Sequence, residues 1–141
     1  MGLVDGMSKA DLERLSEFRY QLRRFLRFSE EACKSKGLTP LQYQLLLSIK
    51  GYPGRPWATV GELAERLQTA QHGVVALVSR CVRLGLVRRV PGVVDRRQVE
   101  VHLTAKGERS LARVAELHRK ELTSLPEIFR IAQRSSAEPV S

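Results

Sequence analysis

Seven arginines gather in one stretch of the chain, at positions 66, 80, 83, 88, 89, 96 and 97. The stretch contains no lysine and a single acidic residue, Asp95, so two thirds of the formal net charge of +9 lies in less than a quarter of the 141 residues. Positive charge clustered in this way attracts a polyanion. The cluster therefore predicts contact with the phosphates of a nucleic acid.

A helix-turn-helix followed by a basic hairpin would position these arginines. Thr59 and Glu62 form a capping-box pattern, which predicts a short helix ending at Leu67. After a brief turn, apolar residues recur at helical spacing and predict a second helix through Arg83. Its inward stripe comprises Val74, Leu77, Val78, Cys81 and Leu84. Its outward face comprises Gln71, His72, Val75, Ala76, Ser79, Arg80 and Arg83.

The predicted hairpin follows this second helix directly. Gly85 suits the left-handed conformation that commonly follows a helix end. Residues 86–90 and 99–103 alternate between apolar and polar types, which predicts two strands around a Pro91-Gly92 turn. The hairpin is basic, and its arginines are Arg88, Arg89, Arg96 and Arg97.

Two helices and a loop are predicted before this unit. An apolar stripe indicates a long helix over residues 8–34; its members are Leu12, Leu15, Phe18, Leu22, Phe25, Leu26 and Cys33. Thr39 and Pro40 favour the start of a second helix that runs to about Ile49. A turn-rich loop over residues 51–56 follows, and Trp57-Ala58 is predicted to form a short strand beside the hairpin.

A helix capped by Thr104 is predicted after the hairpin. Its apolar residues recur at near-heptad spacing and comprise Leu111, Val114, Leu117 or His118, and Leu122. Pro126 is expected to interrupt it, a last short helix to reach about Gln133, and residues 135–141 to form a frayed tail. One small domain cannot cover both this stripe and that of the first helix, so we expect an obligate homodimer.

Composition narrows the class of protein. A chain of 141 residues with 43% hydrophobic residues can bury the core of one globular domain. No apolar run approaches the roughly 20 residues of a membrane span, and the first residues lack a signal-peptide pattern, so a cytoplasmic protein is expected. Cys33 and Cys81 are too far apart for a zinc motif, and three dispersed histidines do not form a metal site. We expect no metal and no cofactor.

Four short motifs, in this order, resemble the MarR family of bacterial transcription regulators, over about residues 12–122. They are Gly37-Leu38-Thr39-Pro40-Leu41-Gln42, Glu62-Leu63-Ala64-Glu65-Arg66-Leu67, Gly85-Leu86-Val87-Arg88-Arg89, and Asp95-Arg96-Arg97 followed by Leu103-Thr104-Ala105-Lys106-Gly107. Each motif is weak by itself, but the four together are specific.

The resemblance implies an α+β, mostly helical fold: a winged helix-turn-helix with N- and C-terminal dimerisation helices. We expect a single domain over residues 1–141, with dimerisation helices at 8–36 and 104–134, the winged helix-turn-helix at 38–103 and the wing near 86–103. The resemblance also implies a homodimeric repressor that binds double-stranded DNA at a palindromic operator and is relieved by a ligand or an oxidant. The predicted helix that ends at Arg83 would enter the major groove, and the wing tip would reach the flanking minor groove.

The residues predicted to contact DNA lie on the outward face of that helix and on the wing. They are Gln71, His72, Ser79, Arg80, Arg83, Arg88, Arg96 and Arg97. For the wing-tip arginines the alternative is a solvated hairpin tip. In the family pattern Asp95 orients the arginine two residues later, so we expect it to brace the wing. The helix departs from the family at Ala70, where a serine cap is common, and in its few polar groups for reading bases.

An effector pocket is a further hypothesis. Aromatic rings with a nearby guanidinium could hold a small aromatic or anionic molecule, and the candidates are Phe18, Arg19, Arg23, Phe25 and Tyr43. Ordinary core packing is the alternative for each of them. Cys33 and Cys81 could sense oxidants, but both lie on apolar stripes, which favours buried packing.

Three classes of function compete. The first is a sequence-specific DNA-binding transcriptional regulator, a repressor relieved by a small molecule. The second is a winged-helix protein-interaction module, or a non-specific DNA-binding protein with weak readout; the arginine cluster argues against an interaction module. The third is an enzyme, and the sequence contains no phosphate loop, nucleophile elbow or paired ligand spacing that would support one.

Overall fold

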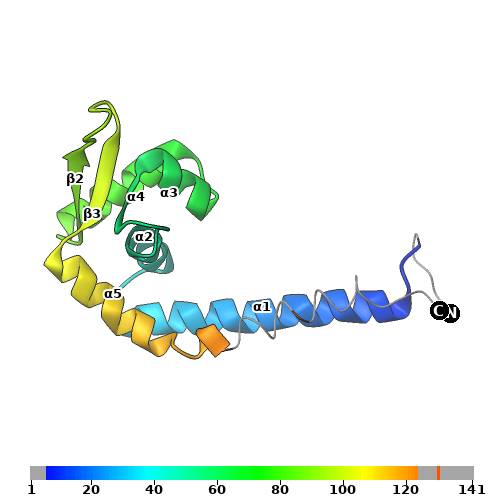
Figure 1. Ribbon diagram of the computed structural model, residues 1–141. Helices are drawn as coiled ribbons and strands as arrows, with labels where there is room; N and C mark the ends of the chain where they lie inside the picture. Colours follow the sequence, from blue (N-terminus) through cyan, green and yellow to red (C-terminus); the bar gives the residue numbers. More distant parts are fainter. Residues whose placement is uncertain (1–5, 124–129, 131–141) are drawn as a thin grey trace. The chain divides into compact units, whose positions relative to one another are not determined.

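The computed structural model describes residues 6–123 and 130, which form helices and one small antiparallel sheet (Figure 1). The helices are α1 (Lys9–Ser35), α2 (Pro40–Lys50), α3 (Val60–Leu67), α4 (Gln71–Arg83) and α5 (Ala105–Leu117). The strands are β1 (Trp57–Thr59), β2 (Val87–Pro91) and β3 (Val99–Leu103), in the order β1-β3-β2. This is the predicted α+β winged helix-turn-helix. The predicted break at Pro126, the helix to Gln133 and the tail over 135–141 lie outside the described residues.

The chain divides into two compact units, which we call the stem and the winged-helix unit. The stem comprises residues 1–31 and 117–141, and the winged-helix unit comprises residues 32–116. None of the helices in the described part of the chain has the length and apolar character to cross a membrane.

Local capping sets the helix starts in the winged-helix unit. The side chains of Thr39 and Thr59 each accept a hydrogen bond from the backbone N–H three residues later. The side chains of Gln42 and Glu62 in turn accept a bond from the backbone N–H of Thr39 and Thr59, which completes two capping boxes. Thr104 likewise accepts from the N–H of Gly107, at 3.0 Å. These bonds satisfy N–H groups that the helix itself leaves free, which is why all three starts were predictable.

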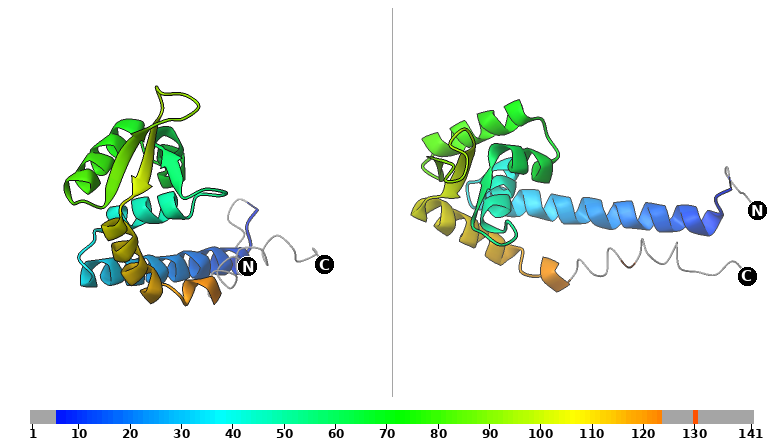
Figure 2. Two further views of the ribbon diagram at one scale, coloured as in Figure 1. Left: turned by 60° about the vertical axis from the view of Figure 1, so that its left-hand side comes forward. Right: turned by 45° about the horizontal axis from the view of Figure 1, so that its top comes forward.

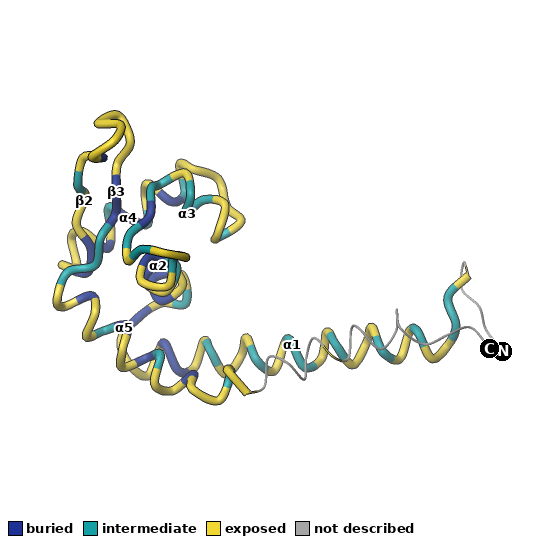
Figure 3. The backbone as a smooth tube through the Cα atoms, in the orientation of Figure 1, coloured by how far each residue is buried: buried dark blue, intermediate teal, exposed yellow. Residues whose placement is uncertain are grey.

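The core of the winged-helix unit draws on every one of its elements (Figure 3). Its fully buried side chains include Leu45, Leu46, Ile49, Leu63, Val74, Val78, Val101 and Val114. Leu111 and Val114 of α5 belong to this core, so the chain itself covers these two members of the stripe that we expected a partner to cover. Gly107 lets α5 approach β2 closely, because a Cβ there would lie 1.9 Å from the carbonyl oxygen of Leu86.

Three details differ from the sequence prediction. Leu84 follows the end of α4 and is exposed rather than part of the buried stripe. The hairpin turns through residues 92–98, because Pro91 pairs with Val99 on an edge strand, where a proline costs no ladder hydrogen bond. The helix that begins at Ala105 ends at Leu117, a turn follows over residues 118–120, and residues 121–123 are helical again.

In the stem, the end of α5 has a local cause. The His118 ring is buried, with Nε2 2.9 Å from Oγ of Ser29 and the ring edge-on to Phe28. Beyond it the backbone changes to bonds between residues three apart, such as Glu121 N–H to His118 carbonyl at 2.9 Å, which tighten the turn. Apolar residues of α1 remain exposed in the single chain: Leu12, Leu15, Leu26 and Phe28.

Candidate nucleic-acid interface

The outward face of α4 is the surface that the helical period predicts. Gln71, His72, Arg80 and Arg83 are all exposed, whereas Val74, Val78 and Cys81 are buried on the opposite side. Val75, on the outward face, is 45% exposed. The helix therefore offers solvent one amide, one imidazole and two guanidinium groups, separated by small apolar side chains.

The start of α4 has no side-chain cap. Ala70 occupies the N-cap position with an extended backbone and cannot accept a hydrogen bond through its side chain. Ala70, Gln71 and His72 are exposed, so the positive end of the helix dipole faces solvent. That end would favour a phosphate oxygen over a positively charged group.

Ser79 is already engaged within the chain. It is half-buried, and its Oγ accepts a hydrogen bond from Nη2 of Arg89 at 2.6 Å, across from β2. Sequence reasoning placed Ser79 among the free base-reading groups and did not single out Arg89 as its partner. Ten residues separate the two, so only the packing of the hairpin on α4 reveals the pair.

The wing loop, residues 92–98, is closed by hydrogen bonds. The Gly92 N–H donates to the Gln98 carbonyl at 2.8 Å, and the Gln98 N–H donates to the Asp95 carbonyl at 3.0 Å. Gly92 is required here, because a Cβ would lie 2.3 Å from the carbonyl oxygen of Asp95. In Figure 1 and the left panel of Figure 2 this loop projects beyond the helices of its unit.

Asp95 contacts the arginine that follows it by two residues. Its Oδ1 accepts from the backbone N–H of Arg97 at 3.0 Å and lies 3.7 Å from Nε of the same residue. The Arg97 side chain is nonetheless 96% exposed. The carboxylate therefore holds the backbone turn and leaves the guanidinium available to another molecule.

Helix and wing residues line one hollow of about 340 Å³. Its lining residues are Thr59, Val60, Gly61, Gln71, Val75, Arg97, Gln98 and Val99. Gln71 of α4 and Arg97 of the wing loop thus lie on the same face of the winged-helix unit. Arg80 and Arg83 are exposed further along α4, and Arg88 and Arg96 on the hairpin.

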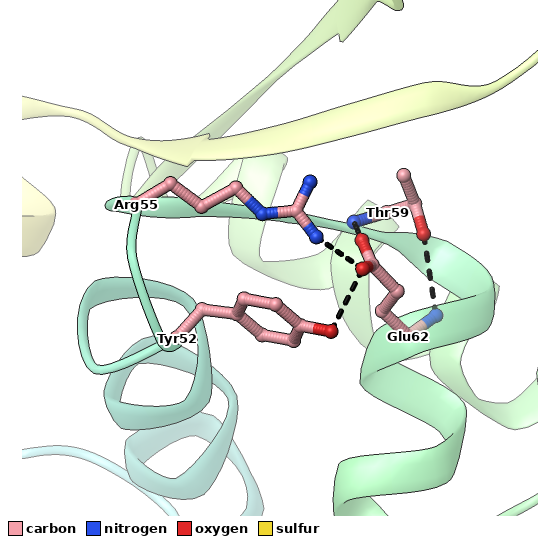
Figure 4. Close-up of polar contacts among 4 residues, drawn as sticks. All are labelled: Tyr52, Arg55, Thr59 and Glu62. Atoms are coloured by element: carbon pink, nitrogen blue, oxygen red, sulfur yellow. Dashed lines mark hydrogen bonds and ion pairs between the residues drawn. The ribbon is translucent and has the colours of Figure 1, made fainter.

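Tyr52 and Arg55, which the sequence analysis did not single out, extend the predicted capping box of Thr59 and Glu62 into a polar network at the start of α3 (Figure 4). One oxygen of the Glu62 carboxylate accepts from the Tyr52 hydroxyl at 2.7 Å and from the Arg55 guanidinium. The other accepts from the Thr59 N–H at 2.9 Å. Burial by itself raises the pKa of Glu62, but these hydrogen bonds and the Arg55 charge together lower it to about 2.

Arg55 is also held between aromatic rings. Its guanidinium carbon lies 3.9 Å from the centre of the Trp57 ring and 4.5 Å from that of Tyr52. Trp57 stacks in turn on His102 of β3, with ring centres 5.9 Å apart. The loop before β1 is thereby attached to both α3 and the sheet, although its sequence indicated only a turn-rich connection.

The residues predicted to form an effector pocket lie in different units. Tyr43 is buried in the core of the winged-helix unit, whereas Phe18, Arg19, Arg23 and Phe25 lie on the part of α1 in the stem. Both cysteines are buried, as predicted, and burial raises the pKa of the Cys81 thiol to about 11, which keeps it protonated. Over residues 6–123 and 130, no three His, Cys, Asp or Glu side chains group to hold a metal ion.

Comparison with known proteins gives consistent matches. The model of the MarR family matches residues 36–98. The HTH-type transcriptional repressor MdtR of Bacillus subtilis is 30% identical over 78 residues, which are 55% of this chain and 48% of that protein. The chain spans about half the length of the curated relatives that it matches: 48% of MdtR and 56% of a second relative.

Two solved structures show the same arrangement of elements. A mutant of MarR from E. coli, complexed with operator DNA, superposes with a TM-score of 0.63 at 26% identity, covering 83% of this chain and 79% of that one. A MarR family protein from Bacillus stearothermophilus superposes with a TM-score of 0.72 at 24% identity, covering 94% and 99%.

Proposed function

We propose that the chain is a member of the MarR family and a sequence-specific DNA-binding transcriptional regulator that acts as a homodimeric repressor and has no catalytic activity. The match of the MarR family model to residues 36–98 and the superposition on MarR from E. coli support this. One observation carries the proposal: Gln71 of α4 and Arg97 of the wing loop line one hollow. Exposed arginines extend from that hollow along both elements.

The elements and charges of this surface suit duplex DNA. A major groove about 12 Å wide admits a helix such as α4, whose Gln71 and Arg80 can pair with base edges. The uncapped start of α4 would receive a backbone phosphate, and Arg83 and Arg88 would neutralise others. Arg96 and Arg97, at the tip of the wing, would enter the adjoining minor groove, which attracts guanidinium groups where A·T pairs narrow it.

The stem supports the homodimer. Leu12, Leu15 and Leu26 of α1 are 36%, 47% and 45% exposed in the single chain, and a second copy would bury them. A twofold dimer presents two copies of α4, so its operator would be palindromic. A repressor of this kind would act in the cytoplasm, where bacterial DNA lies.

Relief by a small molecule is the regulatory part of the proposal. Phe18, Arg19, Arg23 and Phe25 offer rings and guanidinium groups that suit an aromatic or anionic effector, and Tyr43 is the weakest candidate because it is a core residue. Adding such compounds to the protein–DNA complex should release DNA, and substitution of Arg19 or Arg23 should lower the response without changing affinity for DNA.

A DNA-binding protein with weak sequence readout is the second candidate. It is favoured by the engagement of Ser79 with Arg89, which leaves few polar groups on α4 to read bases. Selection of genomic fragments by the purified protein distinguishes the two. Enrichment of a palindrome supports the regulator, uniform retention of fragments supports weak readout, and no retention contradicts both.

A further inference from the structure

Two valines at the wing tip are the most exposed large hydrophobic residues in the described part of the chain. Val93 and Val94 are 88% and 102% exposed, against 45% for Val75 on the outward face of α4. The loop between β2 and β3 is exposed along nearly its entire length (Figure 3). Two adjacent, fully exposed valines offer an apolar surface that a partner molecule could cover with a gain in free energy.

The loop presents these side chains in a defined way. The Val93 N–H donates to Oε2 of Glu100 at 3.4 Å, and Glu100 is buried beneath the loop. The Gly92–Gln98 and Asp95–Gln98 backbone bonds close the loop on either side of the valines. The backbone N–H groups of Gly92, Val93 and Gln98 are therefore bonded within the hairpin, while the two valine side chains are exposed.

Charge next to the valines identifies what covers them. Arg96 and Arg97 follow within three residues, and the Arg97 side chain is 96% exposed. A partner must therefore offer apolar surface between rows of negative charge. The minor groove of DNA has this chemistry, because its walls are the C–H groups of deoxyribose and its rims are phosphates. It is also where proteins place apolar side chains beside arginines.

We propose that Val93 and Val94 pack against the sugar walls of the minor groove and make the wing tip a sensor of groove shape. The inference rests on the proposed DNA-binding function and adds the residues that read the groove without hydrogen bonds. In this arrangement the arginines supply attraction to phosphate, and the valines favour grooves whose floor carries no guanine amino group.

The test compares the full-length protein with the double variant Val93→Thr and Val94→Thr. Threonine keeps the branched shape and strand preference of valine but replaces a methyl group by a hydroxyl. Affinity is measured over a series of salt concentrations on alternating A·T, G·C and inosine·C duplexes. The inosine duplex lacks the guanine amino group, so it combines a major groove like that of G·C with a minor groove like that of A·T.

The inference predicts a loss of affinity of about tenfold on the A·T and inosine·C duplexes, from two apolar contacts. The loss on G·C should be smaller, because the amino group already obstructs the groove floor. The salt dependence should stay the same, whereas Arg97→Gln, the control, should reduce its slope by about one. The variant should unfold at the same urea concentration as the parent, since both side chains are exposed.

Two results would overturn the inference and leave the proposed function standing: unchanged affinity on all three duplexes, or an equal loss on all three. Unchanged affinity would assign the valines to a protein or membrane surface instead. An equal loss would mean that the tip does not distinguish minor grooves. If the parent protein binds none of the duplexes at low salt, both the inference and the proposed function fail.

Discussion

The two helices of the helix-turn-helix begin in opposite ways. At the start of α3, Thr59 and Glu62 form a complete capping box, and Tyr52 and Arg55 add further bonds to the same carboxylate. At the start of α4, Ala70 provides no cap at all. The start of α3 is therefore stabilised by side chains of the chain itself, whereas the start of α4, which faces the proposed DNA, has no side-chain cap.

This difference separates stability from recognition. Groups that hydrogen-bond to one another inside the chain stabilise the fold but are unavailable to a ligand, as Glu62 and Ser79 illustrate. Groups left exposed, such as Gln71 and Arg80, contribute little to stability and remain free to bind. Substitutions at the two helix starts should therefore affect different measurements.

The largest effect is expected for Glu62→Ala. It removes the acceptor for the Tyr52 hydroxyl and the Thr59 N–H and leaves the Arg55 charge without its partner carboxylate. We expect a loss of about 2 to 4 kcal/mol in the free energy of unfolding, measured by urea denaturation at fixed protein concentration.

Glu62→Gln is the matched control, because glutamine also completes a capping box. It should lose less than the alanine variant. Preference among DNA sequences, measured on the folded protein, should not change for either variant. A destabilisation below about 0.5 kcal/mol, the range of ordinary surface substitutions, would contradict the anchoring role.

The second prediction concerns acid. Because the pKa of Glu62 is lowered from 4.5 to about 2 in the folded protein, its contribution to stability is complete above pH 4.5. The contribution is lost as the pH falls from about 4.5 towards 2, where the folded protein must also take up the proton. Urea denaturation of the parent should therefore show stability falling through this range, and Glu62→Gln should show a flatter profile. Parallel profiles for the two proteins would assign the acid sensitivity to other carboxylates.

The third prediction concerns α4. Replacing Gln71 or Arg80 by alanine should cost about 1 to 3 kcal/mol in binding to the preferred DNA site and less on random duplex. Replacing Arg88, proposed to contact phosphate, should weaken both by similar amounts. Unfolding free energies should change little, since Gln71, Arg80 and Arg88 are exposed. Equal losses on both DNAs for the Gln71 and Arg80 variants would argue against base reading by this helix.

The same contrast explains what the sequence could predict. Helix starts at Thr39, Thr59 and Thr104 depend on residues three apart, and the outward face of α4 follows from its helical period, so both were readable locally. The Arg89–Ser79 bond and the stack of Trp57 on His102 join elements that are distant in the sequence, and no local pattern marks them. The hairpin turn was misplaced because Pro91 indicates a turn, whereas pairing with Val99 keeps it in the strand.

The smallest effect is expected at Ala70. Ala70→Ser supplies the missing cap and should raise the free energy of unfolding by about 1 kcal/mol, with little change in affinity for DNA. Ala70→Asp should stabilise the fold to a similar extent, because a carboxylate also suits the positive end of the helix. The two variants therefore match in stability but differ in charge at the start of α4.

That charge is what the proposed DNA would detect. A carboxylate at position 70 would repel the phosphate, so Ala70→Asp should weaken DNA binding severalfold at low salt and progressively less as salt screens the repulsion. Thr39→Asp places the same charge at the start of α2, outside the set of residues proposed to contact DNA, and should leave affinity nearly unchanged. If Ala70→Asp bound DNA as tightly as Ala70→Ser, the open start of α4 would have no role in binding phosphate, and its lack of a cap would be only a loss of stability.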